Sequence, residues 1–158
     1  MPVSHQEAIA VLTAPGAQFE THLISIAGFE VTAFKNSPNN LREVFDLSRT
    51  RGESVFVVYE DERWTFDETM KHVDAVAAML VNTYGIKKGD RVAIAMRNYP
   101  EWVISFAAIL SIGAVSVSFN AWWTQDENDF ALEDSGAKVL LCDEERSERS
   151  AKSIARLG

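Results

Sequence analysis

The feature that most constrains the fold is an alternation of apolar and helical segments between residues 91 and 142. Apolar segments occupy 91–96, 114–119 and 138–142, and helix-length segments occupy 100–112 and 124–136. Nearly continuous apolar strands that alternate with helices are typical of a buried parallel sheet with right-handed crossovers. The sequence therefore predicts an α/β protein with a parallel βαβαβ sheet and flanking helices.

Local start and stop signals support these helices. Pro100 suits the first position of a helix, and Thr124 with Glu127 forms a capping-box pattern. Gly113 and Gly136 follow the last helical residues, where a left-handed conformation commonly ends a helix. A final helix is expected over 144–157. The acidic run 143–145 most simply favours its N-terminus through the helix dipole.

The first part of the chain reads as a lead-in, residues 1–52, before the α/β part, residues 53–158. The lead-in is predicted to hold a short helix capped at Ser4, a hairpin with strands 19–26 and 30–35, and a helix over about 40–50.

The predicted helix 100–112 is apolar almost all round, so other elements must pack against more than one of its sides.

The α/β part is expected to open with strands 55–59 and 63–66, followed by a helix capped by Asp67 and stopped by Gly85. The core face of that helix is predicted from apolar residues at three- and four-residue steps. These are Met70, Val73, Ala77, Leu80 and Tyr84.

Charge and cysteine content restrict the partners and the compartment. The chain has 23 acidic and 15 basic residues, a net charge of −8, and no basic stripe, so nucleic acid and anionic membranes are poor partners. Its one cysteine, Cys142, cannot form an internal disulfide, which favours the cytoplasm. The run from Trp102 to Trp123 is uncharged, but its serines and glycine favour a buried helix and strand over a membrane span.

The usual catalytic patterns are absent from the sequence. No dinucleotide fingerprint or Walker phosphate loop is present, and His5, His22 and His72 fall in unrelated segments. Ser135 with Lys138 has the spacing of some acyl enzymes, but it lies at a helix stop, without the partner motifs. Cys142 is expected to pack, not react, and no metal site is expected.

The pair Trp122–Trp123 is the strongest candidate for a binding role. It directly follows the second parallel strand, and ligands of open α/β sheets bind at the carboxyl ends of the strands. The rings could stack on a base, line an apolar channel or pack under another domain. Core or interface packing is the simpler interpretation.

An ordered set of short motifs between about Phe34 and Arg146 carries a family resemblance. The segments are YEDERWTF at 59–66, GIKKGDRVAI at 85–94, RNYPEW at 97–102, GAV at 113–115, NAWWT at 120–124 and LEDSGAKV at 132–139. In order and spacing, this set resembles the N-terminal part of the AMP-binding, adenylate-forming acyl-CoA synthetases. Each motif is weak alone, and the ordered set is specific.

The resemblance implies a parent protein that joins a fatty or other carboxylic acid to CoA with ATP and Mg²⁺, releasing AMP and pyrophosphate. The family's phosphate loop, adenine segment, ribose-binding Asp and C-terminal Lys are missing from residues 1–158. The chain is thus expected to be a catalytically incomplete fragment, an excised domain or the product of a truncated gene. No cofactor is expected to bind it tightly. The remainder of the same polypeptide would be its partner, and self-association could cover apolar surface left open.

The resemblance also bears on the two tryptophans. Some relatives place a basic residue two positions after the Asn that corresponds to Asn120, where it meets the nucleotide of CoA. Trp122 stands at that position, so the ionic contact is lost and only stacking on the nucleotide remains. Trp122 with Trp123 is therefore the candidate contact on the CoA side.

Two alternatives stay open for the chain as a whole: a stand-alone CoA- or nucleotide-binding or assembly module, and a flavodoxin- or receiver-like domain.

Overall fold

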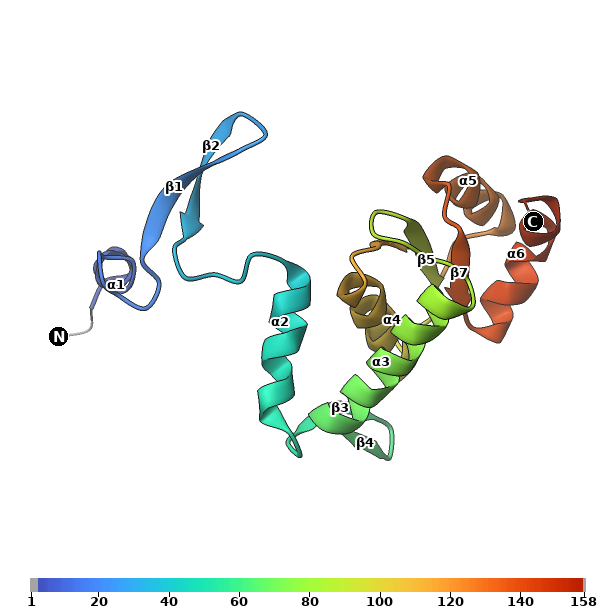
Figure 1. Ribbon diagram of the computed structural model, residues 1–158, viewed down its shortest axis with the longest axis horizontal. Coiled ribbons are helices and arrows are strands. Elements are labelled where there is room, and N and C mark those ends of the chain that lie inside the picture. Colours follow the sequence, from blue (N-terminus) through green and yellow to red (C-terminus); the bar gives the residue numbers. More distant parts are fainter. Residues whose placement is uncertain (1–2, 158) are drawn as a thin grey trace. The chain divides into compact units, whose positions relative to one another are not determined.

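The protein consists of two compact units, which join at Asn40 and Leu41. The computed structural model describes residues 3–157, and Figure 1 traces them from the N-terminal unit in blue to the last helix in red. Sequence reasoning placed the helix over about 40–50 at the end of the lead-in. That helix belongs to the second unit, because it packs against elements of that unit.

The first unit contains one helix and one hairpin. Helix α1 (His5–Leu12) carries the expected capping box between Ser4 and Glu7. Strands β1 (Thr21–Ile26) and β2 (Phe29–Phe34) pair antiparallel through a two-residue turn, Ala27–Gly28, in which both φ angles are positive, as the right-handed twist of a hairpin requires.

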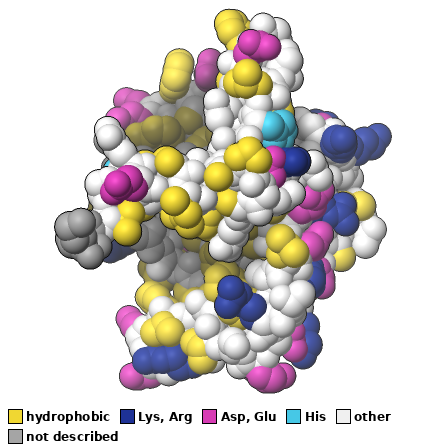
Figure 2. Space-filling model, turned by 90° about the vertical axis from the view of Figure 1, so that its left-hand side faces the viewer, with side chains coloured by type: hydrophobic (Ala, Val, Ile, Leu, Met, Phe, Trp, Pro, Cys, Tyr) yellow, Lys and Arg dark blue, Asp and Glu magenta, His cyan; other side chains and the backbone are white. Residues whose placement is uncertain are grey.

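The first unit has little interior of its own. None of the described residues 3–40 is buried. Apolar side chains of the hairpin, including Leu23, Phe29 and Phe34, are more than half exposed. Figure 2 shows hydrophobic side chains, in yellow, at the surface of the molecule.

The second unit begins with helical and hairpin elements that lead to the sheet. In chain order they are helix α2 (Leu41–Ser48), a 3-10 turn (Arg49–Arg51), strands β3 (Val55–Tyr59) and β4 (Glu62–Thr65), and helix α3 (Phe66–Asn82). Strands β3 and β4 pair antiparallel, as the sequence predicts.

Helix α3 corrects two expectations. Its N-cap is Thr65, not Asp67, because Thr65 has an extended backbone and its hydroxyl accepts the Glu68 amide at 3.1 Å, while Glu68 reaches back to close the box. Tyr84 is 54% exposed and lies outside the core, because the helix ends at Asn82. The other four predicted core positions are buried.

The predicted parallel sheet is confirmed. It has the order β6-β5-β7, with β5 in the centre and both neighbours parallel to it. Its elements are β5 (Arg91–Ala95), α4 (Pro100–Ser111), β6 (Val115–Ser118), α5 (Gln125–Ser135), β7 (Val139–Cys142) and α6 (Glu144–Leu157). Pro100 opens α4, and Thr124 with Glu127 caps α5, as expected.

The sheet lies between two helical layers. Val92 and Ile94 of β5 face a core that includes Leu80 of α3 and Ile109 of α4. The alternate residues Ala93 and Ala95 face a core that includes Leu132 of α5. Figure 1 shows α3 and α4 on one side of β5 and β7, and α5 and α6 on the other.

Helix α4 is covered on several sides, as its apolar composition requires. It contacts α2, α3 and strands β3, β5 and β6. Phe45 of α2 meets Phe106 edge-to-face, with ring centroids 6.2 Å apart.

Among the described residues, no helix is long and apolar enough to cross a membrane.

Candidate functional site at the carboxyl edge of the sheet

The three parallel strands end at one edge, and the loops that follow them diverge. The chain leaves β5 for α4 on one face, whereas it leaves β6 for α5 on the other face. A reversal of this kind opens a crevice at the carboxyl ends of the strands, where open α/β sheets bind ligands. Arg97, Trp122 and Asp143 follow β5, β6 and β7 at this edge.

The loop after β6 places the two predicted tryptophans in different environments. The Trp122 amide donates to the Asn120 side-chain oxygen at 3.0 Å, and the Trp123 amide donates to the Asn120 carbonyl at 3.1 Å. Trp123 is half-buried and packs against Phe119, with ring centroids 5.4 Å apart. Trp122, by contrast, is 67% exposed.

A buried arginine fixes this loop. The Arg146 side chain is 2% exposed, and its guanidinium donates to the Ala121 carbonyl through Nε at 2.8 Å and through Nη2 at 2.6 Å. The same group forms ion pairs with Asp143 at 3.3 Å and with Glu145 at 2.7 Å. Burial of this charge is tolerated because two carboxylates and a carbonyl oxygen satisfy it.

Asp143 connects the remaining strand ends. One of its oxygens accepts the Arg97 amide at 3.1 Å, two residues after the end of β5, and the other accepts the Arg146 amide at 3.0 Å, in the first turn of α6. Sequence reasoning interpreted the acidic run most simply as favouring the helix dipole. Asp143 in fact ties together the ends of β5 and β7, and through Arg146 also the loop after β6.

A cation and an aromatic ring face each other at this edge. The Arg97 guanidinium lies over the Trp122 ring, 4.5 Å from its centroid, and the Arg146 guanidinium lies 5.9 Å from the same centroid. Contacts of this length are favourable cation–π interactions. Arg97 and Trp122 line a pocket of about 350 Å³, together with Tyr59, Asn98, Tyr99 and Ala121.

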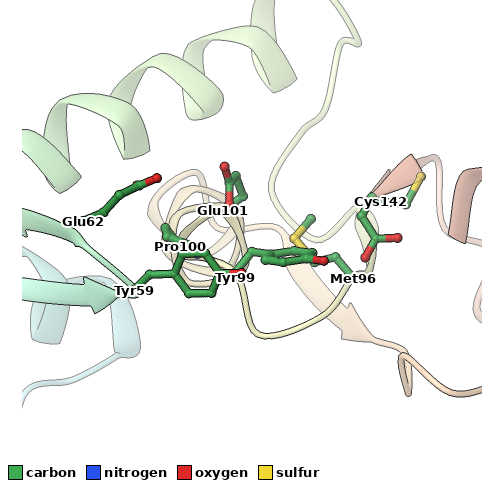
Figure 3. Close-up of a pocket in the computed structure, with 8 residues that line it drawn as sticks. Tyr59, Glu62, Met96, Tyr99, Pro100, Glu101 and Cys142 are labelled. Atoms are coloured by element: carbon green, nitrogen blue, oxygen red, sulfur yellow. The ribbon is translucent and has the colours of Figure 1, made fainter. Parts of the chain in front are cut away.

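A second pocket, of about 400 Å³, shares Tyr59 and Tyr99 with the first. Figure 3 shows Tyr59 at one end of it and Cys142 at the other. Its charged lining is acidic: Glu62, Glu101 and Asp143.

The chemistry of this second pocket is not that of an activated nucleophile. Partial burial raises the pKa of the Cys142 thiol, and Asp143 adds to the rise, although a hydrogen bond with Ser147 lowers it. Partial burial also raises the pKa of the Tyr59 phenol, and nearby carboxylates such as Glu60 and Glu101 add to it. Both groups therefore stay protonated at neutral pH.

The other patterns weighed from the sequence do not assemble. The Ser135 hydroxyl donates to the Leu132 carbonyl, whereas Lys138 pairs with Asp90 at 2.7 Å near the opposite edge of the sheet and lowers the pKa of that carboxyl. The three histidines lie on α1, β1 and α3. In residues 3–157, no group of three His, Cys, Asp or Glu side chains could hold a metal ion.

Arg97 and Arg146 are the site residues that sequence reasoning missed. The sequence contained a signal that could have identified Arg97, because this residue directly follows a predicted strand whose carboxyl end faces the crevice. Arg146 carried none, because an arginine in the first turn of a charged helix is ordinarily solvated.

Comparison with known sequences places these features in a family. The profile of the AMP-binding enzymes matches residues 45–157. A 2-succinylbenzoate–CoA ligase of Bacillus velezensis is 37% identical over 92 residues, covering 58% of this chain and 19% of the relative. A long-chain-fatty-acid–CoA ligase of Salmonella typhimurium is 34% identical over 103 residues, covering 65% of this chain and 18% of the relative.

Solved structures agree with the fold. The N-terminal subdomain of Klebsiella oxytoca NpsA, in complex with anthranilyl-AMSN, superposes with a TM-score of 0.61 at 30% identity, covering 66% of this chain and 27% of the other. The anthranilate CoA ligase AuaEII, in complex with anthranoyl-AMP, gives a TM-score of 0.72 at 23% identity over 77% of this chain and 24% of the other. The chain thus spans about a fifth of the length of these sequence relatives.

Proposed function

This chain belongs to the AMP-binding enzyme family, and we propose that it is the front portion of an ATP-dependent acid–CoA ligase. The parent reaction would join a carboxylic acid, ATP and CoA into an acyl-CoA, AMP and pyrophosphate. The observation that carries the proposal is the family match over residues 45–157, which includes the whole parallel sheet and its carboxyl edge.

Two kinds of relative support the ligase assignment. The sequence relatives described above are CoA ligases for 2-succinylbenzoate and for long-chain fatty acids. Their substrates differ greatly in size and polarity, so we propose only a carboxylic acid as the substrate class. The single cysteine agrees with work in a reducing cytoplasm.

We further propose that residues 1–158 are catalytically incomplete by themselves. Phosphoryl and adenylyl transfer depends on placing cationic groups and Mg²⁺ around the reacting phosphate. The sequence has no Ser/Thr/Gly-rich loop ending in Lys, and the described residues offer no cluster of metal ligands. We therefore assign no catalytic step to a residue of this chain.

In this proposal the carboxyl edge forms one wall of the CoA entrance. Trp122 is the contact we propose on the CoA side, because its ring is exposed at the edge where ligands bind. Trp123 would contribute less, because its ring packs on Phe119. Arg146 and Asp143 would act as positioning residues that hold the Trp122 loop through the Ala121 carbonyl.

Acid-dependent ATP–pyrophosphate exchange tests the ligase assignment. The product of the complete gene should exchange label in the presence of a suitable carboxylic acid and not in its absence, whereas the 158-residue chain should not exchange with any acid. Exchange by the chain alone would refute its incompleteness. A complete gene product that is inactive with a broad panel of acids would refute the ligase assignment.

A stand-alone CoA- or nucleotide-binding module is the second candidate. The exposed Trp122 ring beside a pocket favours it, because that feature needs no further domain to offer a stacking surface. A stop codon directly after Gly158, together with CoA binding by the chain, would support the module over the ligase fragment.

A further inference from the structure

Arg97 is the arginine at this edge whose charge no carboxylate matches. Arg146 pairs with Asp143 and Glu145, and Arg149 also pairs with Glu145. Within residues 3–157, the Arg97 guanidinium forms no ion pair or hydrogen bond, although its backbone amide donates to Asp143. An exposed cation is thus left unneutralised in a chain whose net charge is −8.

The contact with Trp122 prepares this cation for a ligand. The guanidinium lies over the ring, 4.5 Å from the centroid, so its face is occupied. A stacked guanidinium keeps its N–H edge free, and this planar fork matches the oxygens of a phosphate group. Stacking also restricts the side chain before a ligand arrives, which lowers the entropy lost on binding.

The lining of the adjoining pocket narrows the ligand class. Besides Arg97 it is lined by three aromatic residues, Tyr59, Tyr99 and Trp122, and by Asn98 and Ala121. A flat base can stack on an aromatic ring, and a side-chain amide can form hydrogen bonds with the edge of that base. A guanidinium donates hydrogen bonds to the oxygens of a phosphate. A nucleotide carries all three complementary parts.

The neighbouring pocket fixes the side on which a phosphate can lie. Its charged lining consists of Glu62, Glu101 and Asp143, all carboxylates. These groups repel a phosphate, whereas Arg97 attracts one, and the two pockets share the Tyr59 and Tyr99 rings. A phosphorylated ligand at this edge is therefore directed toward Arg97.

We propose that Arg97, held over Trp122, binds a phosphate group of a nucleotide at the carboxyl edge of the sheet. This inference rests on the proposed function and deepens it: the nucleotide would be that of CoA. The end of β5 would then supply the positive charge that position 122 lacks. Arg97 and Trp122 form one composite contact, with the charge from one strand end and the ring from the next.

The test is calorimetric titration of the 158-residue chain with adenosine 3′,5′-bisphosphate as the probe and adenosine as the uncharged comparison. We expect Arg97→Gln to weaken bisphosphate binding by about tenfold, the usual value of a charge-assisted hydrogen bond, and to leave adenosine binding unchanged. Arg97→Lys should recover part of the loss, because a point charge replaces the fork. Added salt should reduce the difference between the two probes in the wild type.

Arg91→Gln is the matched control, because Arg91 is an exposed arginine at the opposite end of the same strand. It should bind the bisphosphate as the wild type does. Equal losses in the two Gln variants would reduce the effect to overall charge and overturn the proposal. Unchanged binding in Arg97→Gln, combined with loss in Trp122→Ala, would overturn the role of Arg97 and leave the CoA-side assignment standing.

Absence of saturable bisphosphate binding to the wild type would overturn both the Arg97 site and the CoA side of the proposed function. The ligase assignment itself would be judged separately, because ATP–pyrophosphate exchange needs no CoA. Circular dichroism of each variant separates lost binding from lost folding, and Arg97 is exposed, so the fold should be retained.

Discussion

At the scale of single residues, Arg146 determines the shape of the candidate site. It is the largest of the fully buried side chains, and its guanidinium holds the loop after β6 to the start of α6. Trp122 lies one residue after the carbonyl that Arg146 binds. The position of an exposed ring therefore depends on a buried ion pair.

Replacement of Arg146 should be costly. Arg146→Ala leaves the Asp143 carboxylate and the Ala121 carbonyl without their partner, and we expect unfolding free energy to fall by about 3 kcal/mol in urea titrations. Arg156→Ala is the matched control on the same helix: that side chain is 54% exposed and pairs with Glu133, and its loss should cost under about 1 kcal/mol. Similar losses in both variants would contradict the role given to Arg146.

Cys142 should react slowly with alkylating reagents. Burial raises the pKa of its thiol, so at pH 7–8 a smaller fraction is thiolate than in a free cysteine, and the thiolate is the nucleophile. Alkylation by iodoacetamide should be slower than that of a cysteine-containing peptide, and the midpoint of its pH–rate profile should lie at higher pH. A midpoint at or below that of the peptide would contradict this prediction.

At the scale of elements, helices α1, α3 and α5 each begin at a short reciprocal cap. Ser4–Glu7, Thr65–Glu68 and Thr124–Glu127 each form a complete capping box. In each box the acidic side chain binds the N-cap amide, and its negative charge also lies at the favourable end of the helix dipole. Accordingly, hydrogen bonding lowers the pKa of all three glutamates.

Loss of one cap should have a measurable effect on stability. Thr65→Ala removes the hydroxyl that accepts the Glu68 amide, and we expect a loss of about 1 kcal/mol in chemical denaturation. Thr83→Ala is the same change at the other end of α3, where the residue is exposed and only its backbone amide bonds to the helix. The control should stay within about 0.5 kcal/mol of the wild type; an equal effect at both ends would argue against the capping box.

The elements were predictable from sequence to a greater extent than the site. Apolar runs and capping signals predicted every strand of the sheet and the first residue of α4, because those signals act locally. The cap of α3 was misplaced by reading Asp67 alone, where the Thr65–Glu68 pair was the stronger pattern. The sequence located Trp122 at the carboxyl edge from its place after a strand, and its binding role stays a prediction. The contacts of Arg97 with Asp143 and of Arg146 with Ala121 were not predicted, because these partners lie 46 and 25 residues away in the chain.

At the scale of the whole molecule, the two units differ in how much interior they have. The second unit contains all three described core clusters, whereas none of the described residues 3–40 is buried. A segment that buries so little surface gains little hydrophobic free energy to offset its conformational entropy. The second unit therefore supplies the stability of the chain.

Separating the units should show this directly. Residues 41–158 should unfold cooperatively, with a midpoint in urea close to that of the full chain, and residues 1–40 alone should show no cooperative transition by circular dichroism. The unfolding transition of the full chain serves as the reference. A large drop in the midpoint on removal of residues 1–40 would contradict the independence of the second unit.

The strand order β6-β5-β7 has a consequence for how the protein forms during synthesis. Strand β5 leaves the ribosome first and occupies the middle of the sheet, so β6 and β7 each arrive when an edge of an earlier strand is already available. Within residues 3–157 the sheet can grow outward in the order of translation, and none of its three strands has to be inserted between two others. Each crossover helix emerges just before the strand that it delivers, so assembly can keep pace with elongation.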